Sequence, residues 1–272
     1  MNKFVRVSLE VALTLCVAGG LAGCSRQSAA PQAPPPSAAD AVATQQAELA
    51  TTLLNASYYS VLQNPALKAF VKAKADPVLQ KECTGCHGAD LKGRRGVPNL
   101  VDEEWLWGTG SDEDTDETKV IQIQQTLLFG IRNQDCPDSS QKQHYGGCPD
   151  TRYSAMPAWG KVGIFTPAEI DDLTEYTLSL SGQKVDKAAA ARGKKNWQPC
   201  VECHGPAGRG FAPYGGPDLT DQSWLFGGDR QTVHDIIFNG SEGACPPWGR
   251  KLDATTIKAL AVYIYAMSTE NY

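Results

Sequence analysis

The pattern Cys-x-x-Cys-His occurs twice in this chain, and this repetition constrains the fold more than any other feature. The two copies are Cys83–His87 and Cys200–His204, and Gly follows each of them. In this pattern the two thiols bond covalently to a haem and the adjacent His reaches its iron. Two complete copies therefore predict two covalently bound haem c groups. The thioether bonds are expected at Cys83, Cys86, Cys200 and Cys203, and the near-side iron ligands at His87 and His204.

Two other chemistries use closely spaced cysteines. A thioredoxin-type redox pair expects a βαβ context, and this chain has no convincing strand runs. A single zinc site would have to draw its ligands from both copies, although each copy is already complete. Haem is favoured over both because the pattern recurs together with a matching downstream sequence.

The similarity between the two halves continues beyond the motifs. Matched segments are Pro98–Leu100 with Pro217–Leu219, Trp105–Gly108 with Trp224–Gly227, and Met156–Gly160 with Cys245–Gly249. Apolar residues between 170 and 180 recur 87 positions later, between 257 and 267. A repeated unit of this length predicts two tandem domains of one fold. We expect these domains over residues 76–182 and 183–272.

The closing segment of each half has the pattern of an amphipathic helix. Thr166-Pro167-Ala168-Glu169 is a capping box with Pro at the first helical position. Asp253 is expected to cap the matching helix of the second half. Apolar residues at intervals of three and four follow both caps. Residues 41–75 are expected to form a helical lead-in, with one helix over residues 41–63, so the predicted fold class is all-α.

The N-terminus has the features of an export signal. Lys3 and Arg6 precede an apolar run over residues 11–21, which is shorter than the roughly 20 residues that span a bilayer. Residues 1–23 are therefore predicted to be a signal peptide. Leu21-Ala22-Gly23-Cys24 resembles the bacterial lipoprotein cleavage box, which implies lipidation at Cys24. An ordinary signal peptide with a chance Cys is the alternative. Residues 24–40 have the Pro- and Ala-rich composition of a linker.

The matched segments as a set resemble a known family over about residues 76–272. The chain is similar to the dihaem cytochrome c subunit, subunit III, of cbb3-type cytochrome oxidases, and more generally to class I cytochromes c. The resemblance implies that Met156 is the distal ligand of a haem iron. It also implies that the carbonyl groups of Pro98 and Pro217 orient the two ligand His side chains. The oxidase subunit has N-terminal transmembrane helices, whereas a signal peptide and a lipid site are expected here.

The second half departs from the family at its distal ligand. Cys245 stands where Met is expected, and the chain has only three Met, of which Met1 leaves with the signal peptide and Met267 matches Leu180. Cys245 is therefore predicted to bind the second haem iron as a thiolate, giving that haem the lower potential and the Met156-ligated first haem the higher one. A free thiol and a five-coordinate iron remain alternatives. His234 is expected at the surface.

The remaining cysteines concern the insertion in the first half. Cys136 and Cys148 both begin a Cys-Pro-Asp sequence. They are predicted to form a disulfide, as is common in an oxidising compartment, and a metal-binding loop is the alternative.

These expectations define a function class. The net charge of -5 argues against a nucleic-acid partner. The expected protein carries single electrons on the periplasmic side of a bacterial membrane, held there by its lipid. Its partners would be redox proteins, with a terminal oxidase or reductase as acceptor, and it would be an electron carrier more than an independent enzyme. Two alternatives are a thiosulfate dehydrogenase-like enzyme with a Cys-ligated haem and the cytochrome subunit of a membrane dehydrogenase.

Overall fold

Local capping signals set several of the helix boundaries in the computed structural model, which describes residues 37–109, 114–134, 148–153 and 155–272. The predicted signal peptide, Cys24 and Cys136 lie outside these described residues. Residues 42–272 form one unit, and residues 1–41 form a separate one. Among the described residues, no helix is both long and apolar enough to cross a membrane.

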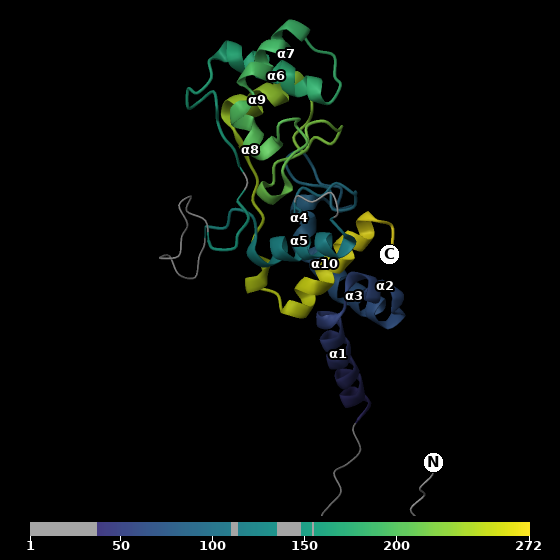
Figure 1. Ribbon diagram of the computed structural model, residues 1–272. Coiled ribbons are helices and arrows are strands. Elements are labelled where there is room, and N and C mark those ends of the chain that lie inside the picture. Colours follow the sequence, from purple (N-terminus) through teal and green to yellow (C-terminus); the bar gives the residue numbers. More distant parts are fainter. Residues whose placement is uncertain (1–36, 110–113, 135–147, 154) are drawn as a thin grey trace, which may run out of the picture. The chain divides into compact units, whose positions relative to one another are not determined.

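The described part of the chain is mainly helical, as expected (Figure 1). The α-helices are α1 (Ala38–Asn55), α2 (Tyr58–Gln63), α3 (Pro65–Val78), α4 (Thr84–His87), α5 (Asp116–Phe129), α6 (Pro167–Leu180), α7 (Lys187–Gly193), α8 (Val201–His204), α9 (Arg230–Asn239) and α10 (Ala254–Ser268). Shorter helical turns are η1 (Leu79–Cys83), η3 (Lys194–Asn196), η4 (Gln198–Cys200), η5 (Ala212–Tyr214) and η6 (Trp248–Arg250).

The caps predicted for the two closing helices are confirmed. Thr166 and Glu169 form a reciprocal capping box at the start of α6. Asp253 accepts a hydrogen bond from the Thr256 amide at the start of α10. The helix expected over residues 41–63 is instead broken into α1 and α2, because Ser57 adopts an extended conformation and caps α2. A polar cap residue inside an apolar periodic stretch competes with helix continuation.

One pair of short strands was not expected. Strand β1 (Ala155–Met156) pairs antiparallel with β2 (Ser241–Glu242), with Ala155 opposite Glu242. Strands of two residues give no alternating pattern in a sequence. Their pairing depends on bringing together two segments that are far apart along the chain.

A first hydrophobic core forms where α10 packs against α3 and α5, and these helices lie side by side in Figure 1. Its fully buried members include Val71 of α3, Val120 of α5, and Ile257 and Leu260 of α10. Cys83 of the first motif packs against this core. The last helix of the chain therefore covers the haem motif of the first half.

A second core forms where α6 packs against α7 and α9. Its buried members include Ile170 and Leu173 of α6, Trp197, and Cys200 of the second motif. The helix that closes the first repeat in the sequence therefore covers the haem motif of the second half.

The packing thus crosses the boundary between the repeats. Residues 76–182 and 183–272 stay predictions as domain limits, whereas each hydrophobic core combines a motif from one half with the closing helix of the other. Both closing helices carry the same apolar periodicity, so either one presents a suitable face to either core. The sequence pattern alone therefore does not decide which core each helix joins.

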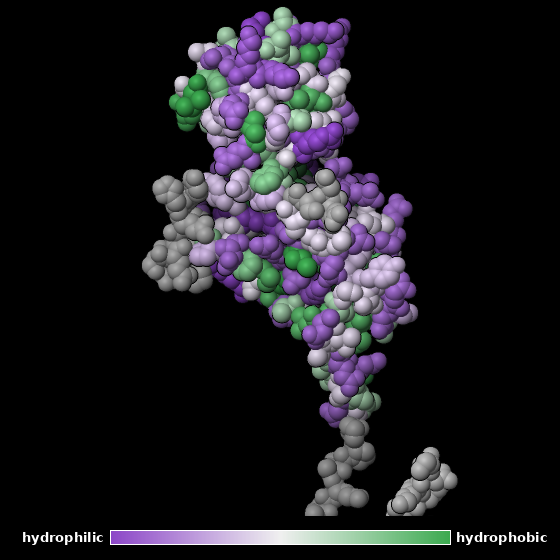
Figure 2. Space-filling view, in the orientation of Figure 1, coloured by the Kyte–Doolittle hydropathy of each residue, from purple (hydrophilic) through white to green (hydrophobic). Residues whose placement is uncertain are grey.

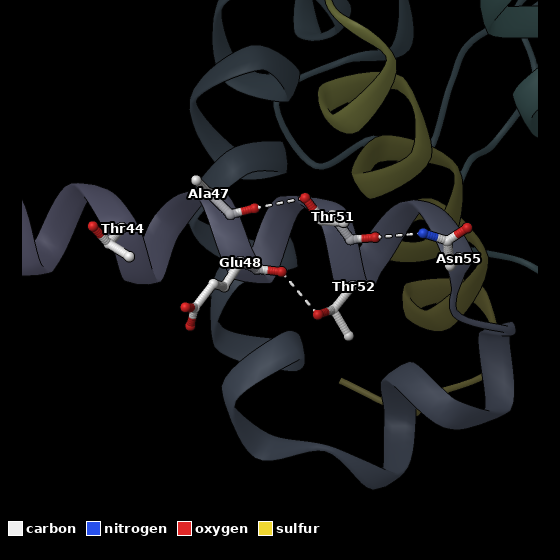
Figure 3. Close-up of a pocket in the computed structure, with 6 residues that line it drawn as sticks. All are labelled: Thr44, Ala47, Glu48, Thr51, Thr52 and Asn55. Atoms are coloured by element: carbon white, nitrogen blue, oxygen red, sulfur yellow. Dashed lines mark hydrogen bonds between the residues drawn. The ribbon is translucent and has the colours of Figure 1, made fainter.

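On the face shown in Figure 2, hydrophobic residues lie in small groups among polar ones and form no extended hydrophobic patch. A hollow along α1 is lined by Thr44, Ala47, Glu48, Thr51, Thr52 and Asn55 (Figure 3). The side chains of Thr51, Thr52 and Asn55 donate hydrogen bonds to carbonyl groups of the same helix. This hollow is the surface of one polar helix and brings no reactive groups together.

Candidate functional site

The first motif lies on a tight helical turn. The π-helical turn η1 ends at Cys83 and leads directly into α4, which carries Cys86 and ends at His87. Gly88 follows with a φ of 84°, a conformation that favours glycine. The Nδ1 atom of His87 lies 2.8 Å from the carbonyl oxygen of Pro98. Since a carbonyl oxygen only accepts, Nδ1 carries the proton and Nε2 keeps its lone pair for a metal ion.

The second motif repeats this geometry. Turn η4 ends at Cys200, and α8 carries Cys203 and ends at His204. Gly205 follows with a φ of 70°. The Nδ1 atom of His204 lies 3.1 Å from the carbonyl oxygen of Pro217. Burial lowers the pKa of His204, and likewise that of His87, which favours the neutral ring that can bind a metal ion.

The four motif cysteines are free thiols. Burial raises the pKa of Cys83 and of Cys200 to about 11. Neither cysteine belongs to a disulfide. Their positions beside an apolar core suit covalent attachment of a large apolar ring better than surface redox exchange.

Buried hydrogen-bond donors near both motifs show whether the surroundings suit a haem, because a haem would supply acceptors for them. The indole Nε1 atoms of Trp105, Trp159 and Trp224 are buried and have no hydrogen-bond partner among the described residues. Trp105 packs against the first core, and Trp159 and Trp224 pack against the second. Buried donors without acceptors are rare in proteins and point to a bound group that supplies acceptors. Haem carries two carboxylates, so the donor set fits it.

Met156 lies with the second motif. It packs against the core that contains Trp197 and Cys200. Its carbonyl oxygen approaches Gly240, directly after α9, and the next turn of its segment brings Gly160 against Phe238. The segment expected to supply a ligand to the first motif is therefore held by helix α9 of the second half.

Cys245 lies with the first motif. Its backbone forms hydrogen bonds in both directions with Ile131, directly after α5, at 2.9 and 3.3 Å. Burial, together with the nearby thiols of Cys83 and Cys86, raises the pKa of the Cys245 thiol to about 11. The turn η6 that follows Cys245 packs on α5. These contacts place Cys245 beside the motif of the opposite repeat.

Two glycines that hold these segments were missed in the sequence. Gly130 ends α5 with a φ of 74°, and Gly240 ends α9 with a φ of 75°. A Cβ atom at Gly130 would lie 2.5 Å from the Cys245 carbonyl oxygen, and one at Gly240 would lie 2.6 Å from that of Met156. Both positions therefore require glycine for two reasons: the backbone φ is positive, and a Cβ atom would collide with a neighbouring carbonyl group. The sequence does contain a signal for these two glycines, because each one directly follows the helix that comes after a Trp-Leu segment.

The other residues singled out in the sequence lie apart from these sites. His234 is partly exposed, with Nε2 3.5 Å from an Asp171 carboxylate oxygen. Met267 packs against the first core. Cys148 is disulfide-bonded, and its expected partner Cys136 lies outside the described residues. Within the described ranges, no three His, Cys, Asp or Glu side chains form a group that could hold a metal ion by themselves.

Comparison with known proteins gives consistent matches. A family described as "Cytochrome C oxidase, cbb3-type, subunit III" matches residues 188–264. The cbb3-type cytochrome c oxidase subunit FixP of Bradyrhizobium sp. (strain ORS 278) is 41% identical over 217 residues, covering 79% of this chain and 67% of that protein. The subunit CcoP of Azospirillum sp. (strain B510) is 34% identical, covering 81% of this chain and 70% of that protein. The subunit CcoP of Cereibacter sphaeroides is 33% identical, covering 84% and 72%.

A match that covers 79% of the chain includes both motifs wherever it begins, because each motif lies far from both ends of the sequence. The chain spans about two thirds of the length of the relatives it matches. The paired motifs, the helical fold and the identity to FixP and CcoP agree, and the chain belongs to the family of cbb3-type cytochrome c oxidase subunit III.

Proposed function

We propose that this chain is a periplasmic dihaem cytochrome c that passes single electrons to a terminal oxidase of the cbb3 type. The observation that carries the proposal is the repeated geometry of the two motifs. In both, a short helix ends at a His whose Nδ1 atom is bonded to a Pro carbonyl oxygen, at 2.8 Å in one and 3.1 Å in the other. The names of the relatives support an oxidase as the partner.

We further propose a crossed assignment of the distal ligands. Met156 packs with Cys200 in the second core, which supports pairing it with His204. Cys245 lies within electrostatic range of Cys83 and Cys86, and its backbone is hydrogen-bonded to Ile131 just after α5, which supports pairing it with His87. This reverses the pairing within each repeat that the sequence suggested. The haem with the thiolate ligand, and thus the lower potential, would then be the first one.

The residues of the chain have defined parts in this function. The four motif cysteines would fix each haem covalently, and Pro98 and Pro217 would hold the ligand His rings in one tautomer. Haem iron supplies a one-electron redox couple when it is bound. His204 is buried whereas His87 is partly exposed, so water is better excluded from the second motif than from the first.

The lipid anchor at Cys24 and the disulfide between Cys136 and Cys148 belong to the same proposal. Both are consistent with an exported protein, and a lipid would hold the carrier at the membrane that contains its acceptor. Lipidation is checked by the mass of the mature N-terminal peptide.

Haem attachment gives the most direct test. Exported from a host that attaches haem c, the purified chain is expected to carry two porphyrins by intact mass, with all four motif thiols consumed. The double variant Cys83→Ala/Cys86→Ala should carry one porphyrin, and so should Cys200→Ala/Cys203→Ala. A colourless wild-type protein would contradict the proposal.

The partner is tested separately. The chain is expected to co-purify with an oxidase and to be oxidised by it at a rate that depends on both haems. Steady turnover of thiosulfate by the isolated chain, with no oxidase present, would instead favour the sulfur-oxidising enzyme. Cys245 near the first motif is the feature that makes this second outcome worth measuring.

A further inference from the structure

The backbone around Ile131 joins three separate segments in one place. Ile131 pairs with Cys245 on one side and with Arg152 on the other. The Arg132 amide donates to the Arg152 carbonyl oxygen at 2.7 Å, and the Arg152 amide donates to the Gly130 carbonyl oxygen at 3.1 Å. We call these segments, Gly130–Arg132, Arg152 and Cys245, the seam. It places the Gly130–Arg132 segment between Arg152 and the candidate ligand Cys245.

Arg152 is a buried cation with neutral surroundings. Its residue is only 8% exposed. One terminal nitrogen donates to the Gln122 carbonyl oxygen at 3.1 Å, to the Gln122 side-chain oxygen, and to the Gln125 side-chain oxygen at 3.2 Å. The guanidinium carbon lies 4.4 Å from the centre of the Trp107 ring. The Nε atom is buried without a hydrogen-bond partner.

No carboxylate of the described residues pairs with Arg152, in contrast to other arginines of the chain. Arg132 in the same seam pairs with Glu242, Arg192 with Asp172, and Arg230 with Glu175. Burial alone lowers the pKa of Arg152, to about 10, with no opposing contribution from a nearby acid. A buried charge is normally paired, because isolation from water penalises the charged form. Among the described residues, the surroundings of Arg152 therefore lack the anion that a buried charge is expected to have.

Arg152 lies between elements of both haem sites. Gln122 and Gln125 belong to α5, whose apolar residues line the first core. Trp107 on its other side lies against Gly215, and the adjacent Gly216 lies against the backbone carbonyl of Cys203. Elements that carry or cover both haem motifs therefore meet at Arg152. Arginine binds carboxylates with parallel N–H donors, and Nε is one of the donors that this geometry uses.

We propose that Arg152 binds a propionate carboxylate of one of the two haems and so sets that haem's potential. The proposal rests on the haem attachment proposed above. Arg152 is a positioning residue, because it acts on the iron through the carboxylate. A cation near the haem favours the reduced state, which carries one positive charge less than the oxidised state. Loss of the cation should therefore lower the potential of the haem that Arg152 contacts.

The test measures both haem potentials in the full-length holoprotein. Arg152→Gln removes the charge and is expected to decrease the reduction equilibrium constant of one haem about tenfold, which corresponds to about 59 mV for one electron. The other haem should change much less. Arg152→Lys keeps the charge and should restore most of the potential. The haem that shifts is identified by repeating the measurement in the two single-haem variants.

A second variant keeps the result decisive if Arg152→Gln fails to fold. Gln122→Glu is nearly isosteric and offers Arg152 a carboxylate at a contact it already makes. It is expected to compete with the propionate and to lower the potential of the same haem. Gln124→Glu on the same helix adds the same charge without a contact to Arg152, and its shift should be clearly smaller.

The outcomes separate this inference from the proposed function. Two covalent haems whose potentials in Gln122→Glu equal those in Gln124→Glu would overturn the assignment of Arg152 and leave the electron-transfer proposal standing. Equal shifts of both haems in Arg152→Gln would also contradict it, because they would indicate general loosening. Absence of covalent haem from the wild-type chain would instead remove the basis of both proposals.

Discussion

Replacing Cys245 with Ala is expected to alter the spectrum of the haem at the first motif and to leave the haem at the second motif unchanged. The physical reason is the position of Cys245 beside Cys83 and Cys86, where its backbone is hydrogen-bonded to Ile131, just after α5. The measurement is made in the two single-haem variants, by optical absorption and electron paramagnetic resonance. A thiolate signature should be present only where the first motif is intact, and Cys245→Ala should abolish it.

The reciprocal variant provides the control. Met156→Ala should change the haem held by Cys200 and Cys203 and spare the haem held by Cys83 and Cys86, because Met156 packs with the second core. The opposite pattern in both variants would show that each repeat supplies its own distal ligand, and the crossed pairing would be wrong. Unchanged spectra in Cys245→Ala would mean that this thiol binds no iron.

Potentials should follow the same assignment. Cys245→Met is expected to raise the potential of the first haem by on the order of 0.1 V or more, since axial ligands tune haem potentials over about 0.8 V. The sign follows from chemistry: a thiolate donates electron density and favours ferric iron, whereas a thioether favours ferrous iron. Potentiometric titration of Cys245→Met against the wild-type chain measures the shift.

Truncating one buried leucine in each closing helix is expected to destabilise opposite cores. Leu260 of α10 and Leu173 of α6 are each only 1% exposed. Leu260→Ala and Leu173→Ala should each lower the free energy of unfolding by about 2–5 kcal/mol. Amide hydrogen exchange should locate the effects, with faster exchange in α3 and α5 for Leu260→Ala and in α7 and α9 for Leu173→Ala.

An exposed leucine supplies the matched control. Leu54 of α1 is 47% exposed, so Leu54→Ala should change the free energy of unfolding by no more than about 0.5 kcal/mol. If Leu260→Ala instead accelerated exchange in α7 and α9, the closing helix would pack within its own repeat. The stability effect alone would not distinguish the two arrangements, so the exchange map is the deciding measurement.

Local chemistry in the sequence was sufficient for several features. The one capping box and the one Asp cap correctly placed the starts of α6 and α10, because these signals act over four neighbouring residues. The predicted all-α fold is confirmed for the same reason, since apolar periodicity is also local. The single helix predicted over residues 41–63 was wrong, because Ser57 caps a second helix inside a stretch whose apolar periodicity indicates only one.

The sequence by itself determined the helical character of the chain, its two repeated motifs and its family. Only the tertiary structure decided which closing helix covers which motif, which distal segment packs with which motif, and that Arg152 is buried with no carboxylate partner among the described residues. The physical reason is that the apolar periodicity of an amphipathic helix specifies which face is buried but not which other helices bury it. Two similar repeats offer that face two nearly equivalent cores, so the outcome depends on contacts between segments far apart in the sequence, such as the pairing of Ile131 with Cys245 and with Arg152.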